Sequence, residues 1–118
     1  MAIAVTNPQP GKSGFILNAT SADASGCEEL KAAVVGKCIY IDQITINNGA
    51  NAISHTIGEG ETGGAVTTAL IGPIAMAANS SIQWTFPDGM TLTKATSLTI
   101  DSSGAGAVCV FATGKLVD

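Results

Sequence analysis

Residues 38–47 read Cys-Ile-Tyr-Ile-Asp-Gln-Ile-Thr-Ile-Asn, and this stretch decides the fold class. Apolar and polar side chains alternate along it, which is typical of a strand with one face against a core. In an uninterrupted strand the first two isoleucines would share one face, and Ile44 and Ile46 would lie on the other. This change of parity predicts a β-bulge at Asp42-Gln43.

Similar strand signals continue on both sides of this stretch. Short apolar or alternating segments are separated by clusters of glycine, proline, asparagine and serine at intervals of about 8–12 residues. The predicted strands cover residues 14–18, 28–35, 38–47, 52–57, 65–71, 81–86, the very short 90–92, 97–101 and 107–113. We therefore expect an all-β domain over residues 14–118, a single antiparallel β-sandwich or jelly roll of about eight strands.

Glycine and proline mark three predicted interruptions between these strands. Residues 58–64, Gly-Glu-Gly-Glu-Thr-Gly-Gly, are expected to form a flexible loop. The pair Gly72-Pro73 is expected to end the strand that precedes it, because proline lacks a backbone donor. Pro87-Asp88-Gly89 is expected to form a turn, since proline fixes φ and glycine accepts the left-handed conformation.

Residues 1–13 differ from the rest of the chain and form a predicted N-terminal arm. An apolar tip precedes a segment with two prolines and a glycine, which disfavours helix and favours an extended chain. The arm is either a disordered tail or a strand that adds to a neighbouring subunit. The second interpretation predicts partner contacts at Ile3, Val5, Asn7, Pro8, Pro10 and Lys12.

The composition is poor in charge, which bears on the kind of partner. Only 12% of the residues are charged, there is no arginine, and the net charge is −4; an ordinary soluble domain is about 25% charged. We therefore expect neither nucleic-acid binding nor attachment to an anionic membrane, since both need clustered cations. No apolar run reaches the roughly 18 residues of a membrane span, and no signal peptide is evident, so synthesis in a cytoplasm is expected. The uncharged surface instead predicts contact with other protein, including copies of the same chain.

Catalytic, metal and cofactor chemistry finds little support in the sequence. The single histidine, His55, lies on an alternating strand and is interpreted as structural, so we expect neither an enzyme nor a bound cofactor or metal. The three cysteines are interpreted as buried free thiols, with a single disulfide such as Cys27–Cys109 as the alternative. Glu59 and Glu61 are interpreted as a solvated loop tip, with Ca²⁺ binding at a subunit interface as the alternative.

Carbohydrate binding is the main alternative function, because β-sandwiches often bind sugars on exposed aromatic rings. Trp84 and Phe86 alternate with polar residues and are expected to face the core. Tyr40 is then the one good candidate for an exposed aromatic platform.

The order of strands and turns resembles a known family. The segments that carry the resemblance are residues 30–48, 68–79, 82–86 and 92–100, followed by the closing apolar strand. They resemble small jelly-roll virion proteins of tailed bacteriophages, in particular capsid decoration (cement) proteins. The resemblance implies a trimer or dimer on the outer surface of the phage head that clamps neighbouring major capsid proteins, often through an N-terminal arm. It brings no catalytic residues, and a tail or fibre component of the same fold is the variant.

Overall fold

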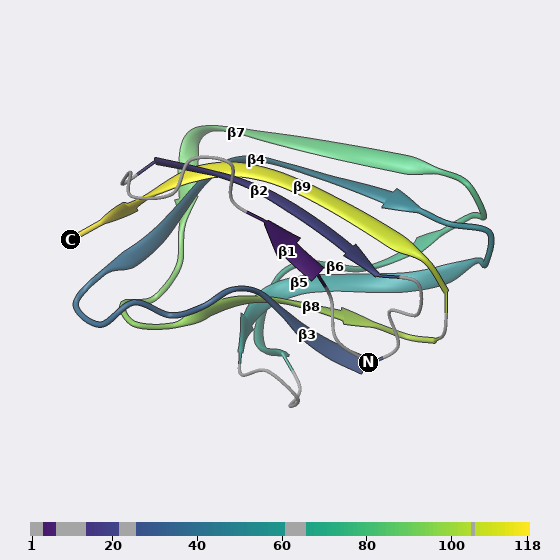
Figure 1. Cartoon of the computed structure of the whole chain (residues 1–118), viewed down its shortest axis with the longest axis horizontal. Helices are drawn as coiled ribbons and strands as arrows, with labels where there is room; N and C mark the ends of the chain where they lie inside the picture. Colours follow the sequence, from purple (N-terminus) through teal and green to yellow (C-terminus); the bar gives the residue numbers. More distant parts are fainter. Residues whose placement is uncertain (1–3, 7–13, 22–25, 61–65, 105) are drawn as a thin grey trace.

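The computed structural model shows an all-β protein, in which the described residues form nine strands in two antiparallel sheets (Figure 1). It describes residues 4–6, 14–21, 26–60, 66–104 and 106–118. The strands are β1 (Ala4–Thr6), β2 (Gly14–Ser21), β3 (Gly26–Lys31), β4 (Cys38–Asn48), β5 (Ile53–Gly60), β6 (Val66–Met76), β7 (Ser81–Thr91), β8 (Ser97–Ser102) and β9 (Val108–Val117). The described part contains no helix with the length and hydropathy that crossing a membrane would require.

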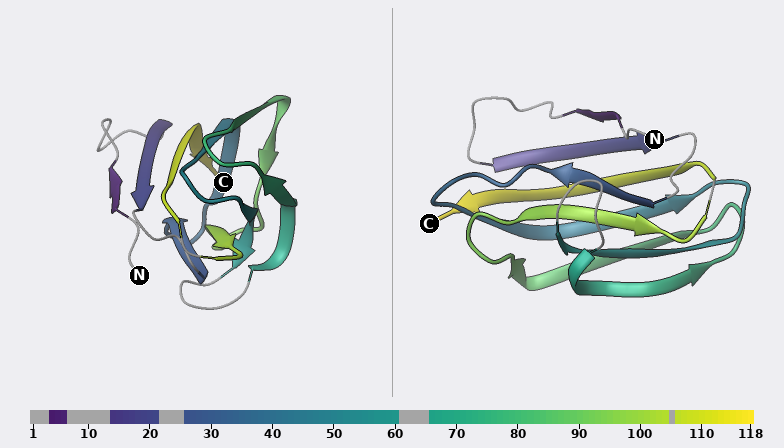
Figure 2. Two further views of the ribbon diagram at one scale, coloured as in Figure 1. Left: turned by 90° about the vertical axis from the view of Figure 1, so that its right-hand side faces the viewer. Right: turned by 90° about the horizontal axis from the view of Figure 1, so that it is seen from below.

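The two sheets have the connectivity of a jelly roll. One sheet has the order β1-β2-β9-β4-β7 and the other the order β3-β8-β5-β6. Strand β5 pairs with β6, β4 with β7, β3 with β8 and β2 with β9, so the pairs are nested from the middle of the chain outward. A long hairpin rolled up in this way is a jelly roll, and Figure 2 shows its two layers from the side and from below. The predicted fold class is confirmed.

The predicted bulge in β4 is confirmed and explains the parity of its isoleucines. The pairing of β4 with both β7 and β9 shifts between Ile41 and Gln43. The extra residue, Asp42, is exposed, and the strand resumes with its inward face restored. Ile39 before the bulge and Ile44 after it therefore point into the same core, each no more than 1% exposed.

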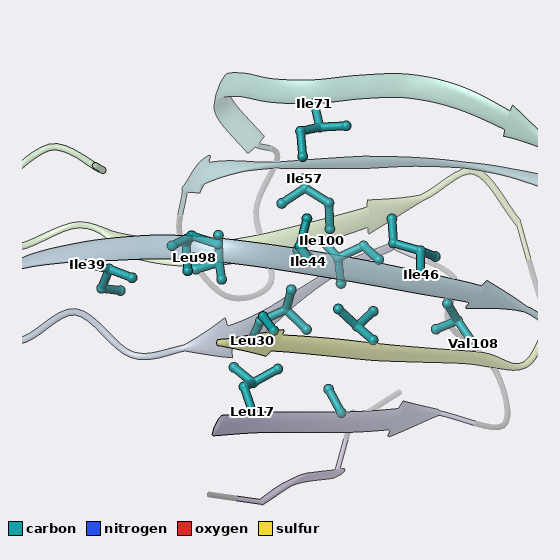
Figure 3. Close-up of a cluster of buried hydrophobic side chains, with 14 of the residues drawn as sticks. Leu17, Leu30, Ile39, Ile44, Ile46, Ile57, Ile71, Leu98, Ile100 and Val108 are labelled. Carbon is teal, nitrogen blue, oxygen red and sulfur yellow. The ribbon is translucent and has the colours of Figure 1, made fainter. Parts of the chain in front are cut away.

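The core lies between the two sheets and consists mainly of branched aliphatic side chains (Figure 3). Isoleucine and leucine side chains from β2, β4, β5 and β8 meet there, because alternate residues of each strand point inward. Trp84 and Phe86 face this core, as expected, but they are only partly buried because β7 is an edge strand. The largest fully buried apolar side chains are Leu30, Ile39, Ile41, Ile44, Ile46, Ile57, Leu92, Leu98, Ile100 and Val110.

The predicted interruption at Gly72-Pro73 is wrong, and the predicted loop over residues 58–64 is wrong at its first three residues; residues 61–64 fall outside the described ranges. Residues 58–60 belong to β5 and are buried. At Gly58 a side chain would overlap the carbonyl oxygen of Thr68, so glycine here permits close approach of β5 and β6. Gly72-Pro73 likewise lies inside β6, as a cis peptide, instead of ending the strand.

The predicted turn at residues 87–89 is a wide bulge within β7. Ile41 pairs with Met90, whereas Gln43 pairs with Thr85, so four residues of β7 lie opposite Asp42 alone. Gly89 has φ of 74°, the left-handed conformation expected of it, but the chain does not reverse. The predicted strand over residues 28–35 is also shorter, because β3 ends at Lys31 and a loop follows in which Val35 is 94% exposed.

Candidate interaction surface

The predicted arm contacts lie mostly outside the described residues. Only Val5 among them is described, in β1, where it pairs with Ala19 of β2. Ile3, Asn7, Pro8, Pro10 and Lys12 fall on residues outside the described ranges. The arm segment Ala4–Thr6 thus extends the five-stranded sheet of its own subunit, and its contact with a partner stays a prediction.

Part of the outer face of the five-stranded sheet is a regular surface without charge, bordered by Lys115 in the next outward row and by Asp42 in the bulge of β4. Inward residues alternate with outward ones along β2, β9, β4 and β7, and the register aligns the outward ones into three rows across the sheet. We call this surface the uncharged face. Its rows are Ile16, Thr113, Gln43 and Thr85; Asn18, Phe111, Thr45 and Gln83; and Thr20, Cys109, Asn47 and Ser81.

Side chains on the uncharged face hold one another in place. The Ser81 hydroxyl donates to Asn47 Oδ1 over 2.6 Å, across β7 and β4. The Gln43 amide donates to the Thr45 hydroxyl along β4. Half-buried Ile16 and Phe111 add apolar area between these polar groups. Because no full charge must lose its water, covering this surface with protein carries little of the desolvation cost that opposes burial of ions.

The described lysines lie instead near one end of the sandwich. Lys37, in the loop before β4, forms an ion pair with Asp118, and its carbonyl accepts a bond of 2.8 Å from the Ala95 amide. Lys115 lies over the Tyr40 ring, 5.0 Å from its centre. The hydrogen bond and charge of Lys37 lower the pKa of the Asp118 carboxyl. These lysines lie beyond the first row of the uncharged face, and Lys115, two residues from Thr113 on β9, is the one that borders it.

His55 is a structural residue at the opposite end, as expected. Its side chain is 1% exposed, and both ring nitrogens have partners. Nδ1 lies 2.8 Å from the Ser102 hydroxyl, and Nε2 lies 3.0 Å from Asn48 Oδ1. Burial lowers the pKa of the imidazole, which keeps the ring neutral.

Asn48 joins the loops at this end, and sequence reasoning missed it. Its amide nitrogen donates to the carbonyl oxygens of Asn51 at 2.9 Å, Ala77 at 3.0 Å and Met76 at 3.3 Å. Three carbonyl neighbours fix the orientation of the amide, so Oδ1 must accept from His55. His55 is therefore the Nε2–H tautomer, and its Nδ1 accepts from Ser102. The only signal in the sequence is the Asn48-Gly49 pair, which is typical of a turn and gives no indication of a buried amide.

The prediction that Glu59 lies at a solvated loop tip is wrong, because this residue is buried in β5 and its side chain holds a neighbouring segment. Its carboxylate, 8% exposed, accepts from the Thr93 amide and from the Thr93 hydroxyl at 3.1 Å. On β8, Asp101 pairs with Thr56 whereas Leu98 pairs with Glu59, so Asp101 is three residues away from the position opposite Glu59. Glu61 falls outside the described residues. No group of three acidic, histidine or cysteine side chains in the described ranges could hold a metal ion.

None of the three cysteines forms a disulfide, as predicted, but their side chains are half-buried and not buried. Cys27 lies on the outer face of the four-stranded sheet and Cys109 on the uncharged face of the other sheet, so the alternative disulfide between them is wrong. Burial, together with the nearby Asp101 carboxylate, raises the pKa of the Cys27 thiol. That thiol is therefore a poor nucleophile.

Tyr40 is not a free aromatic platform. The ring is half-buried, with Lys115 over it. The backbone of Gly89 lies so close that a side chain there would overlap the phenol. The surfaces that a sugar would stack on are thus occupied by the protein itself.

Comparison with known proteins adds no assignment. No protein family, curated protein or solved structure matches this chain.

Proposed function

We propose that this protein is a structural component of a virion, which decorates the outer surface of a bacteriophage head and stabilises it. The observation that carries the proposal is the uncharged face, with twelve outward positions and no ionic group. Its partner would be the major capsid protein, with the decorating protein acting as a homotrimer or dimer. The resemblance described in the sequence analysis supports the same role.

The physical case rests on how such a surface behaves in water and in a complex. Charged side chains on the surface of a monomeric protein keep it soluble and prevent association with other molecules. A flat, uncharged surface with ordered hydroxyl and amide groups can form hydrogen bonds across an interface and bury its apolar atoms at little cost. A ligand that binds only the assembled shell shifts the equilibrium toward that shell, so decoration raises capsid stability.

The test is binding to undecorated phage capsids, followed by their thermal melting. We expect saturable binding at a fixed ratio and a higher melting temperature of the shell. Thr45→Lys, at the centre of the uncharged face, should weaken binding about tenfold or more, because a charge would be buried without a partner. Ala33→Lys is the matched control, since it adds the same charge to an exposed loop away from this face.

Two results would contradict the proposal. One is absence of binding to any capsid preparation by a folded protein. The other is an equal loss with Thr45→Lys and Ala33→Lys, which would place the contact elsewhere. Binding to tails or fibres in place of heads would favour the tail variant of the same structural role. The carbohydrate-binding alternative is not proposed, because the Tyr40 ring is covered.

A further inference from the structure

Each sheet of a sandwich has two edge strands, and exposed edges tend to pair with other chains. Natural proteins prevent this with short strands, charges, prolines or bulges. Three edges here carry such protection. β1 has three residues, and β3 carries Glu28, Glu29 and Lys31 with a shift of register. β6 contains Pro73, and its pairing with β5 shifts repeatedly.

The fourth edge, the first half of β7, has none of these features. Residues 81–85 read Ser-Ile-Gln-Trp-Thr, without charge, proline or glycine. They pair with β4 in unbroken register on one side, and in the described structure no strand pairs with the other side (Figure 1). The wide bulge of residues 86–89, with Pro87 and Asp88, ends this regular stretch. A row of backbone donors and acceptors is therefore available along residues 81–85.

We propose that β7 is a dimer interface, in which residues 81–85 of two copies pair antiparallel about a two-fold axis. The stretch is self-complementary about its midpoint, Gln83. Ser81 would lie opposite Thr85 of the second copy, and Ile82 opposite its Trp84. Gln83 would lie opposite its own counterpart. Each pair joins side chains of one kind, two hydroxyls, two apolar groups or two amides, which is the arrangement that stabilises antiparallel strands.

The two faces of β7 agree with this pairing. Ser81, Gln83 and Thr85 are exposed on the outer side, where water could still reach their hydrogen bonds across the dimer interface. Ile82 and Trp84 face the core but are only partly buried, and the second copy would cover what remains. The one charge in β7, Asp88, lies in the bulge beyond the paired residues 81–85, so the paired stretch contains no carboxylate.

A two-fold axis perpendicular to the sheet also keeps both cores on the same side of the joined sheet. It requires a residue opposite itself, because only then do inward side chains face inward in both copies. If the two strands were centred on Trp84, Phe86 from the wide bulge would have to pair across the interface. Centred on Gln83, the paired residues 81–85 all belong to the regular part of the strand. The product is one continuous sheet with the short β1 at both ends, which closes the assembly. The uncharged faces of the two copies become one surface.

The test uses the purified chain without capsids. Its result therefore does not depend on whether the protein binds a phage head. Sedimentation velocity over a range of concentrations should show a monomer–dimer equilibrium, and emission from the single tryptophan should shift to shorter wavelength as the dimer forms. Gln83→Lys places two ammonium groups opposite each other and should raise the dimer dissociation constant about tenfold or more. Asn18→Lys, in the same row of the uncharged face but on β2, should leave it unchanged.

A cysteine variant tests the register directly. Gln83→Cys should give a covalent dimer under mild oxidation, because residues opposite each other across the axis lie within disulfide reach. Asn18→Cys should give no more cross-linking than the native chain with its three cysteines. A protein that is monomeric or trimeric at all concentrations would overturn the proposal. An equal rise of the dimer dissociation constant in Asn18→Lys and Gln83→Lys would also overturn it. That result would mean that the copies associate through the uncharged face and not through the edge of β7.

Discussion

At the scale of single residues, polar side chains that looked like candidates for chemistry hold loops and strands together. His55 and Asn48 connect β5 to the carbonyls of two loop residues and of the last residue of β6, and the Glu59 carboxylate holds the chain at Thr93. Each of these groups is buried and hydrogen-bonded, so replacing its partner would leave a buried polar atom unsatisfied. These hydrogen bonds stabilise the folded state. Protonation of one of the groups that form them therefore changes the free energy of unfolding.

Stability should fall as the pH drops below the ordinary pKa of histidine. Burial lowers the pKa of His55 in the folded protein below the ordinary value of 6.5. At pH values between the two pKa values, the unfolded chain therefore binds a proton that the folded chain does not. The free energy of unfolding then decreases with falling pH, by at most about 1.4 kcal/mol per pH unit, until the lowered folded pKa is reached. Above about pH 7 this contribution is constant. The contribution of Asp118 has the same sign but belongs to lower pH, because its pKa is lowered from 3.8.

Urea unfolding at a series of pH values between about 7.5 and 5.5 measures this slope. His55→Gln is the control, since a variant without the imidazole should lose the slope even if it is less stable throughout. A flat native profile, or the same slope in both proteins, would contradict the assignment.

At the scale of elements, the strands with regular alternation were predictable and the glycine-containing ones were not. The bulge of β4 follows from a parity change that the sequence shows directly. In β5, Gly58 is read from sequence as a loop residue, but the neighbouring Thr68 backbone needs the space that a side chain would occupy. Trp84 was expected in the core, and its partial burial depends on the place of β7 at the edge of its sheet.

The short strand β1 gives a prediction at this scale. Deleting residues 1–12 should leave the jelly roll folded, because β2 still pairs with β9 along its full length. If the arm contacts the capsid protein, the deletion should weaken capsid binding. Circular dichroism would establish that the shortened protein is folded, and co-sedimentation with capsids would measure the affinity. Unchanged affinity would exclude the arm from the contact.

At the scale of the whole molecule, the distribution of charge is the feature that separates two kinds of surface. The described lysines lie near the end that includes Lys37 and Lys94, whereas the uncharged face and residues 81–85 of β7 carry none. Association through the latter surfaces should depend on hydrogen bonds and apolar burial. Long-range electrostatic attraction should contribute little.

Salt therefore provides a test of how the molecule associates. Raising the ionic strength from about 0.05 M to about 0.5 M should change the affinity for capsids, and that of the dimer, by less than about threefold, because the contacts involve no ion pairs that salt would screen. Binding isotherms and sedimentation at the two salt concentrations make the comparison. A loss of tenfold or more would show that the basic end makes the contact.

The all-β class, the bulge in β4 and the low content of charge could be predicted from the amino-acid sequence, because alternation and composition are local properties of the chain. The contact of His55 with Asn48, the alignment of residues from four strands into the uncharged face, and the unprotected edge of β7 appear only in the folded structure. These features depend on register and strand order. Both are fixed by contacts between segments far apart in the chain, which no local pattern encodes.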